Sequence, residues 1–429
     1  MRITPLDDWI HAKTGAQDEN SLRAYQLEKL RETLSFAKNN SRFYREYLAN
    51  LAVDRIENFN DISSIPFTTA KMLAEAPLDF VCVSPDEVSR IITLPTSGTT
   101  GPSKRVFFTK DDQELTLDYF HHGMSVLVDQ NDKVLIFLPG VTEGSVGDLL
   151  RRGLKRLGCE GIVYGPISDY QNAILALDSS GCTSVVGLPA QIFALCRLGA
   201  ENRLKSVLLC SDYIPSAATR AIESAWGCEV FGQYGMTESG LGSGVECAAH
   251  DGYHMREADL LFEIIDPVSG HPVPDGERGE LVFTTLTRKG TPLIRYRTDD
   301  ISRIVTQPCP CGTWLRRFER VSGRISDIIC LKNGFELSLP MLDEILFSNP
   351  QIAGFSAEIR SSAGGETLVL SVFIPNNNQT TREIREYISS DGRLAVILAD
   401  GAVGLEIRQA GPEVLTYGNT KRRITDKRL

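Results

Sequence analysis

A nine-residue stretch at positions 96–104, TSGTTGPSK, has the composition of a loop that binds phosphate. Its two glycines permit backbone turns in which successive N–H groups point into one concavity, and such a concavity binds oxyanions. The hydroxyl side chains add donors, and Lys104 adds a positive charge. Ser103 stands where a Walker A loop needs glycine, so that pattern is excluded. The alternative is a flexible surface loop, but so long a run directly after the mainly apolar segment 91–94 favours phosphate binding.

The run GQYGMTESG at 232–240 follows a short apolar segment and offers an aromatic ring, a hydroxyl and a carboxylate within five residues. These groups belong to Tyr234, Thr237 and Glu238. A carboxylate works beside a triphosphate when a hard cation such as Mg²⁺ bridges the two negative groups. Alone, the run would indicate a glycine-bounded turn with a helix-capping Thr–Glu pair. The phosphate-binding stretch in the same chain favours a nucleotide site instead.

Three cysteines and a histidine offer the donor set of a structural zinc site. Cys247 and His254 lie in ECAAHDGYHM, and Cys309 and Cys311 lie in PCPCG. Three thiolates and an imidazole bind Zn²⁺ tetrahedrally, and four protein ligands leave no position for a reactive water. His250 is the competing histidine. The alternative is a glycine turn near a histidine with a purely structural role.

The bulk composition is that of an ordinary soluble globular protein long enough for two or more domains. Hydrophobic residues make up 42% and charged residues 23% of the 429 residues. The net charge of −10 argues against nucleic-acid and anionic-membrane surfaces. No segment approaches the roughly 20 apolar residues that span a bilayer, and no secretory signal is visible. Ten cysteines then indicate reduced thiols or metal ligands, so we expect a cytoplasmic protein.

Strand-like apolar runs alternate with helical patterns between residues 134 and 231. This alternation predicts crossover units and a parallel sheet, whose ligands bind beyond the carboxyl ends of the strands. Ser211, Asp212 and the segment 233–235 follow predicted strands and are therefore expected at that edge. The predicted strands are 134–138, 184–188, 206–210 and 229–231, and the predicted helices are 20–38, 146–157, 170–178, 190–199 and 215–226.

The remainder of the chain predicts a β-rich part and a small separate domain. Residues 260–305 alternate apolar and polar side chains in the manner of antiparallel strands. We therefore predict an α/β fold, with a large N-terminal domain of parallel sheets and a β subdomain, and a small α+β C-terminal domain. In the small domain, strands are expected near 327–331, 353–359, 367–374 and 404–409, and helices near 340–348 and 381–389.

The two glycine-rich stretches resemble motifs of the adenylate-forming enzymes, the superfamily of acyl-CoA ligases, carrier-protein adenylation domains and luciferases. From about residue 20 to the C-terminus, the chain is most similar to the branch containing phenylacetate–CoA ligase and coenzyme F390 synthetase. The resemblance implies binding of ATP, Mg²⁺ and CoA. The nucleotide-binding residues that it implies are Thr96, Ser97, Gly98, Thr99, Thr100, Gly101, Lys104, Ser211, Asp212, Gln233, Tyr234, Gly235, Met236, Asp300 and Asp327.

The resemblance also implies individual roles. Tyr234 would lie against the adenine, and Thr237 and Glu238 would help to hold phosphate and Mg²⁺. Asp300 of YRTDD would bind the ribose hydroxyls, although the family more often has glycine at the position of Asp299. The same branch carries a cysteine–histidine and CPCG pattern, which implies a structural Zn²⁺ held by the three cysteines and the histidine named above.

Two further features concern the small domain. The stretch GRISD resembles the family's hinge, with Arg324 near the nucleotide and Asp327 as the pivot. The resemblance therefore implies a boundary between a large domain (1–323) and a small mobile domain (324–429). The family ends with a catalytic lysine in a GK-x-x-R context, whereas this tail reads TYGNTKRRITDKR. Aligning the arginine with Arg423 assigns the lysine position to Thr420, so we interpret Lys421, one residue later, as the catalytic lysine. The alternative is a solvated basic tail.

The sequence therefore predicts an ATP-dependent carboxylate–CoA ligase that passes through an acyl-adenylate. The resemblance implies an aromatic or arylacetic acid, with 137–147 and 120–122 as candidate pocket linings. We expect a small carboxylic acid, ATP and CoA as partners, expect neither nucleic acid nor membrane, and leave a homodimer open. The alternatives are an adenylyltransferase of the F390-synthetase kind, acyl loading of a carrier protein, and a non-catalytic nucleotide-binding relative.

Overall fold

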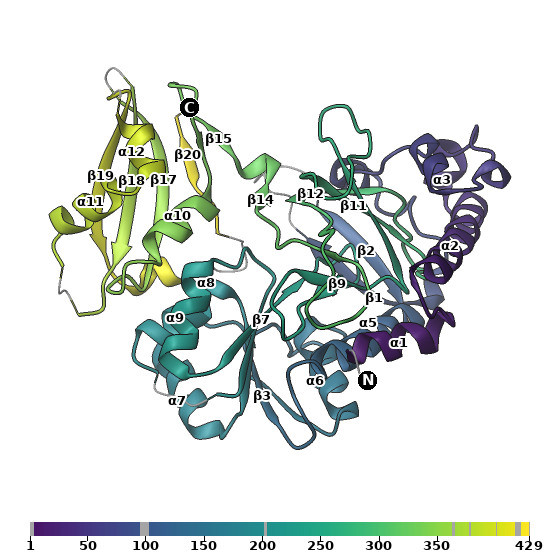
Figure 1. Cartoon of the computed structure of the whole chain (residues 1–429), viewed down its shortest axis with the longest axis horizontal. Helices are drawn as coiled ribbons and strands as arrows, with labels where there is room; N and C mark the ends of the chain where they lie inside the picture. Colours follow the sequence, from purple (N-terminus) through teal and green to yellow (C-terminus); the bar gives the residue numbers. More distant parts are fainter. Residues whose placement is uncertain are drawn as a thin grey trace. The chain divides into compact units, whose positions relative to one another are not determined.

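The computed structural model describes residues 4–94, 103–200, 204–362, 365–376, 379–399, 401–416 and 422–428. The chain forms two compact units (Figure 1). The first combines Met1–Asp132, Pro139–Gly161 and Phe231–Val321, and the second combines Lys133–Leu138, Ile162–Val230 and Ser322–Leu429. The division of the chain at residue 323 into a large and a small domain stays a prediction.

Most of the helices described in the first unit begin at side-chain caps that the sequence supplies. The helix α2 (Glu19–Asn40) starts after Asp18, whose carboxylate accepts a backbone N–H of the first turn, and this confirms the first predicted helix. Thr109 and Asp112 form a capping box at the start of α5 (Lys110–Met124). Further helices of this unit are α1 (Pro5–Thr14), α3 (Arg42–Tyr47), α4 (Ala70–Glu75) and α6 (Val146–Arg156).

Antiparallel strands provide the β structure of the first unit. They are β1 (Val88–Leu94), β2 (Lys104–Thr109), the end of β7 (Glu229–Tyr234), β8 (Gly244–Val245), β9 (Tyr253–Met255), β10 (Leu260–Ile265), β11 (Gly279–Thr285), β12 (Tyr296–Ser302) and β13 (Arg317–Phe318). Strand β1 pairs with β2, and β7 to β9 and β13 form a second ladder. Strands β10, β11 and β12 form a meander in which Phe283 lies opposite both Phe262 and Tyr296. The antiparallel structure expected over 260–305 is therefore confirmed.

Parallel strands run through the part of the second unit that precedes residue 230. The strands β3 (Lys133–Ile136), β5 (Ser184–Gly187) and β6 (Ser206–Cys210) pair in parallel, with β5 between the other two. The side chains of β5 and β6 are buried on both faces, as expected for apolar strands of a parallel sheet. The predicted crossover architecture is therefore confirmed. Neighbouring elements are β4 (Glu160–Val163), α7 (Tyr170–Ser180), α8 (Pro189–Arg197) and α9 (Ser216–Trp226).

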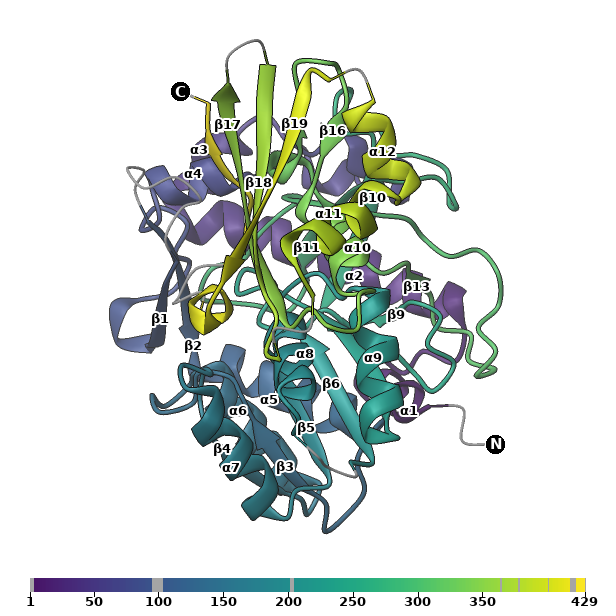
Figure 2. The ribbon, with the colours of Figure 1, turned by 90° about the vertical axis from the view of Figure 1, so that its left-hand side faces the viewer.

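The C-terminal part of the second unit is an α+β module, as predicted. Its elements are β14 (Gly323–Arg324), β15 (Ile329–Cys330), β16 (Glu336–Leu337), α10 (Leu339–Leu346), β17 (Gly354–Ser362), β18 (Gly365–Phe373), α11 (Thr381–Ser389), α12 (Gly392–Leu398), β19 (Val403–Ala410) and β20 (Thr425–Lys427). The main sheet has the order β19–β18–β17–β20, and only its central pair is antiparallel among these strands. Helices α11 and α12 pack beside β19 (Figure 2).

Each unit has a hydrophobic core of its own. Phe80 and Phe283 are fully buried in the first core. In the second, the rings of Phe193 and Phe347 lie with their centroids 4.3 Å apart. Among the helices that the structure describes, we find none with the length and apolar character needed to cross a bilayer.

Candidate active site

Lys104, Glu238 and Tyr296 meet in the first unit, although 192 positions separate the outer two in sequence. The Lys104 ammonium forms an ion pair with Oε1 of Glu238, and the Tyr296 hydroxyl donates to the same oxygen at 3.2 Å. Burial opposes ionisation of Glu238, but the ion pair with Lys104, together with hydrogen bonds from the backbone and from Tyr296, lowers the pKa of the carboxyl. Glu238 is therefore a carboxylate at neutral pH, with a cation and a hydroxyl already directed at it.

Tyr234 and Asp300 form a second pair in the same unit. The Tyr234 hydroxyl donates to Oδ2 of Asp300 at 2.7 Å, and both residues are buried. The ring of Phe318 stands edge-on to the Tyr234 ring, with their centroids 5.3 Å apart. Asp299 has a left-handed backbone with φ of +70°, and its N–H donates to the Glu280 carboxylate at 3.0 Å. The structure thus directs Asp300, rather than its neighbour, toward Tyr234.

The turn that carries Glu238 is closed by its own backbone. Gly235 has no room for a side chain, because a Cβ there would lie 2.4 Å from the Leu241 carbonyl oxygen. The Gln233 amide donates to that same oxygen at 3.2 Å. Two more bonds close the turn: the Met236 N–H donates to Ser239 Oγ at 3.3 Å, and the Gly240 N–H donates to the Thr237 carbonyl at 3.0 Å. Four predicted residues, Gln233, Gly235, Met236 and Thr237, therefore shape the turn that presents Glu238.

Four other predicted residues lie in the second unit. Ser211 follows β6 with a left-handed φ of +70°, and the carboxylate of Asp212 accepts the next backbone N–H at 2.9 Å. Arg324 is half-buried at the end of β14, and Asp327 is exposed in the short turn that follows. Their contacts with a nucleotide stay predictions.

The remaining predicted residues, Thr96 to Gly101 and Lys421, lie outside the described residues, as does Thr420. Tyr296 was not predicted from the sequence, although it begins the motif YRTDD that contains Asp300. The alternation of side chains along a strand could have identified Tyr296. Residues four positions apart on a strand face the same side, and Tyr296 is four positions before Asp300.

Cys247, His254, Cys309 and Cys311 converge in the first unit. Their ligand atoms all lie within 4.8 Å of one another. Two pairs, Cys247 Sγ with Cys309 Sγ and Cys311 Sγ with His254 Nε2, are each 3.6 Å apart. A disulfide would need about 2.0 Å, whereas tetrahedral thiolate ligands of Zn²⁺ lie about 3.8 Å apart at the usual bond length. The donor set and its spacing therefore fit a four-coordinate zinc ion.

A family model described as AMP-binding enzyme matches residues 24–286 of the chain. The chain therefore belongs to the AMP-binding enzyme family. Within that family it resembles the phenylacetate–coenzyme A ligases. It is 29% identical over 380 residues to that of Aromatoleum evansii, which covers 84% of this chain and 82% of the relative. It is 28% identical over 345 residues to that of Thermus thermophilus, with 77% and 76% covered.

Solved structures share the fold. A 2-hydroxyisobutyryl-CoA ligase in the postadenylation state superposes with a TM-score of 0.81 at 19% identity, covering 96% of this chain and 91% of that one. An anthranilate CoA ligase in complex with anthranoyl-AMP gives a TM-score of 0.52 at 16% identity, covering 74% and 63%. The predicted α/β fold with a large N-terminal domain is thus the fold of these enzymes.

Proposed function

We propose that the chain is an ATP-dependent carboxylate–CoA ligase that activates an aromatic or arylacetic acid through an acyl-adenylate. The observation that carries the proposal is the buried cluster of Lys104, Glu238 and Tyr296, in the same unit as the Tyr234–Asp300 pair. Membership of the AMP-binding enzyme family supports ATP as the nucleotide. Similarity to phenylacetate–coenzyme A ligases over most of the chain supports the class of acid and the thiol acceptor.

Lys104 and Glu238 neutralise each other before the nucleotide binds. The negative triphosphate competes for the ammonium, so we expect Lys104 to turn to a phosphate oxygen. Glu238, with Thr237, would then hold Mg²⁺, which supplies neutralisation of the leaving pyrophosphate when it is bound. Tyr296 keeps its hydrogen bond to Glu238 and so retains the carboxylate at this position.

The proposed chemistry needs positioning and charge stabilisation rather than a protein nucleophile. A carboxylate oxygen of the acid attacks the α-phosphorus, a new P–O bond forms, and pyrophosphate leaves with the electron pair of the broken bond. The thiol of CoA then gives up its proton to solvent and attacks the carbonyl carbon of the mixed anhydride. A C–S bond forms, and AMP leaves with the electron pair of the broken C–O bond. In this scheme Arg324 and Lys421 assist at the α-phosphate, and a rotation about Asp327 separates the two steps.

We further propose that the Cys247, His254, Cys309 and Cys311 cluster holds a structural Zn²⁺. The site joins Cys247, which follows β8, and His254 on β9 to the two cysteines of the loop before β13. Four protein ligands give the metal no open position, so its contribution would be to stability.

Replacing Asp300 with asparagine is expected to raise the KM for ATP by about 10-fold to 100-fold, because a charged acceptor for the ribose hydroxyls is lost. The variant should also lose the parent enzyme's preference for ATP over 2′-deoxy-ATP. The ratio of the two KM values measures this. Asp299→Asn is the matched control and should keep the preference; loss of preference in that variant instead would show that the ribose site uses the other acid.

The function is tested by pyrophosphate release from ATP with a panel of aryl and arylacetic acids, each with and without CoA. We expect release that requires the acid and a thioester that appears only with CoA. Acid-dependent release without a thioester would indicate another acyl acceptor, such as a carrier protein. ATP binding without release for any acid would contradict the ligase and favour an adenylyltransferase that acts on a cofactor hydroxyl, or a non-catalytic relative.

A further inference from the structure

Arg288 is a buried cation that reaches the main chain of Glu238. Its side chain is 8% exposed, and its Nη1 donates to the Glu238 carbonyl oxygen. The guanidinium carbon lies 5.1 Å from the centre of the Phe108 ring. Burial lowers the pKa of Arg288 to about 10, while nearby Asp112 opposes that shift. Arg288 therefore keeps its charge at neutral pH and contacts the main chain of Glu238, the residue that pairs with Lys104.

The segment that carries Arg288 is fixed to the start of α5. The buried carboxylate of Asp112 accepts the Lys289 N–H at 2.9 Å and the Gly290 N–H at 2.8 Å. A Cβ at Gly290 would lie 2.4 Å from the Phe107 carbonyl oxygen, so the close approach requires glycine there. The backbone next to Arg288 is therefore held by Asp112, and this determines the position from which the Arg288 side chain extends to Glu238.

A second bond from α5 holds the same turn. The Thr116 hydroxyl donates to the Gly240 carbonyl at 2.9 Å. Gly240 has a φ of +89°, and a Cβ there would lie 2.4 Å from Nη2 of Arg288. Arg288 and Thr116 therefore support the turn at two carbonyls, on either side of Ser239.

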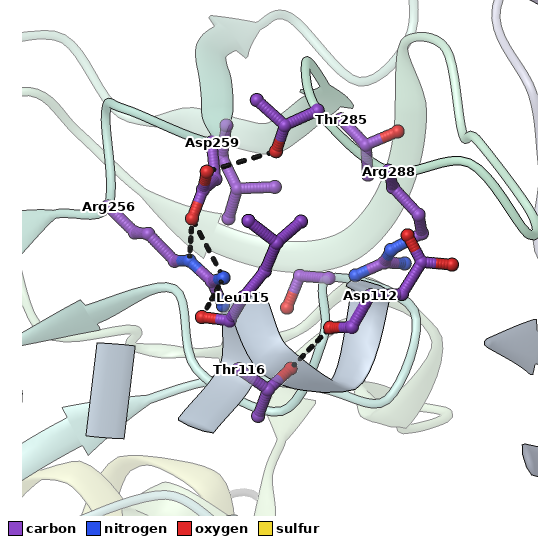
Figure 3. A pocket seen from close by; sticks show the side chains of 10 residues that line it. Asp112, Leu115, Thr116, Arg256, Asp259, Thr285 and Arg288 are labelled. Carbon is purple, nitrogen blue, oxygen red and sulfur yellow. Dashed lines mark hydrogen bonds and ion pairs between the residues drawn. The ribbon is translucent and has the colours of Figure 1, made fainter. Parts of the chain in front are cut away.

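A neighbouring arginine makes different contacts in the same small cavity (Figure 3). Arg256 lies beside Asp259, with 2.8 Å between Nη2 and the carboxylate, and donates to the Leu115 carbonyl at 2.7 Å. Asp259 also contacts Lys13 and accepts from the Thr287 hydroxyl at 2.9 Å. Arg256 is more deeply buried than Arg288 and also donates to the Gly242 carbonyl at 3.3 Å. None of the hydrogen bonds that the structure describes for Arg256 reaches Glu238.

We propose that Arg288 is a positioning residue for formation of the acyl-adenylate. It holds the Glu238 backbone so that the carboxylate faces Lys104 and the metal–triphosphate. The proposal rests on the proposed function, because it assigns to Glu238 the role given there. Without Arg288, the Glu238 carbonyl loses a charged donor and the turn is free to shift. The carboxylate would then be held less well for Mg·ATP, and the effect should appear in binding of the nucleotide.

The test is calorimetric titration of the whole protein with Mg·ATP, without acid or CoA. We expect Arg288→Met to raise the Kd for Mg·ATP by about 10-fold to 100-fold, the range for loss of a charged hydrogen bond. Arg288→Lys should restore part of the affinity, because lysine can still donate to the carbonyl. Arg256→Met is the matched control: its melting temperature should fall at least as much, with the Kd unchanged.

Thr116→Val provides a milder variant, since it removes the hydroxyl bond to Gly240 and keeps the side-chain volume. It should raise the Kd for Mg·ATP by a few-fold, and it decides the matter if Arg288→Met does not fold. A folded Arg288→Met with the parent Kd, or an equal rise of Kd in Arg256→Met, would overturn the proposal. If the parent binds Mg·ATP but forms no thioester, the proposed function fails while this test still decides the role of Arg288.

Discussion

Replacing Glu238 with glutamine is expected to lower acid-dependent pyrophosphate release by about 100-fold to 1,000-fold, the usual loss when a charge-stabilising group is removed. Glutamine keeps the shape of the side chain and can still accept from the Tyr296 hydroxyl. It removes the negative charge that pairs with Lys104 and that would hold Mg²⁺. Steady-state rates at saturating acid, measured over a range of Mg²⁺ concentrations, check this result, and the variant should need more Mg²⁺ for half-maximal rate.

Glu246→Gln is the matched control for this change. Glu246 is fully buried, forms an ion pair with Arg320 and accepts the Gly232 N–H at 2.7 Å, yet it contacts neither Lys104 nor Tyr296 in the bonds that the structure describes for it. Its substitution should lower the melting temperature and leave the Mg²⁺ requirement unchanged. A Glu238→Gln enzyme with the parent rate and Mg²⁺ dependence would contradict the role assigned to Glu238.

Removing the proposed zinc is expected to lower the melting temperature of the protein by about 10 °C. A ligand present at roughly 1,000 times its Kd stabilises the folded state by about 4 kcal/mol, and each kcal/mol corresponds to about 2–4 °C for a domain of moderate size. The loss follows because the two 3.6 Å ligand pairs join segments far apart in sequence. Thermal unfolding with and without a chelator, together with metal analysis, measures the effect.

Cysteine variants distinguish loss of the proposed zinc from the general effect of removing a buried thiol. Cys309→Ser should abolish the bound metal and lower the melting temperature as chelation does. Cys228→Ser, at a buried cysteine of the second unit, should retain one equivalent of zinc. Protein that carries no zinc when purified without chelator, or a melting temperature unmoved by chelation, would show that the cluster is not a metal site.

The sequence predicted those elements whose buried side chains follow a simple pattern. The apolar strands around Val185 and Val207, alternating with amphipathic helices, sufficed for the parallel sheet. Helix α5 was not predicted, because its buried face includes Asp112 and Thr116, which interrupt the apolar repeat. Strand β20 was missed for a related reason: its side chains are exposed, so it carries no apolar signal.

The sequence predicted those residues of the candidate site whose reactive side chains belong to recognisable motifs. Glu238 and Asp300 were predicted from two such motifs, and in the structure each accepts a hydrogen bond from a tyrosine hydroxyl. The four residues of the proposed zinc site were predicted from their thiols and imidazole, and the structure brings these groups together. Arg288 gave no comparable signal, because its contact is a main-chain carbonyl, which every residue offers. Only three-dimensional proximity identifies such a residue.

The most direct test of the central proposal follows oxygen rather than rate. Phenylacetate, or the best acid of the panel, is labelled with ¹⁸O in both carboxylate positions and incubated with the enzyme, Mg·ATP and CoA, and the products are examined by mass spectrometry. An acyl-adenylate requires that one labelled oxygen leaves with AMP and that the thioester keeps the other. Unlabelled AMP, or labelled phosphate together with ADP, would contradict activation at the α-phosphorus and with it the function proposed for this chain.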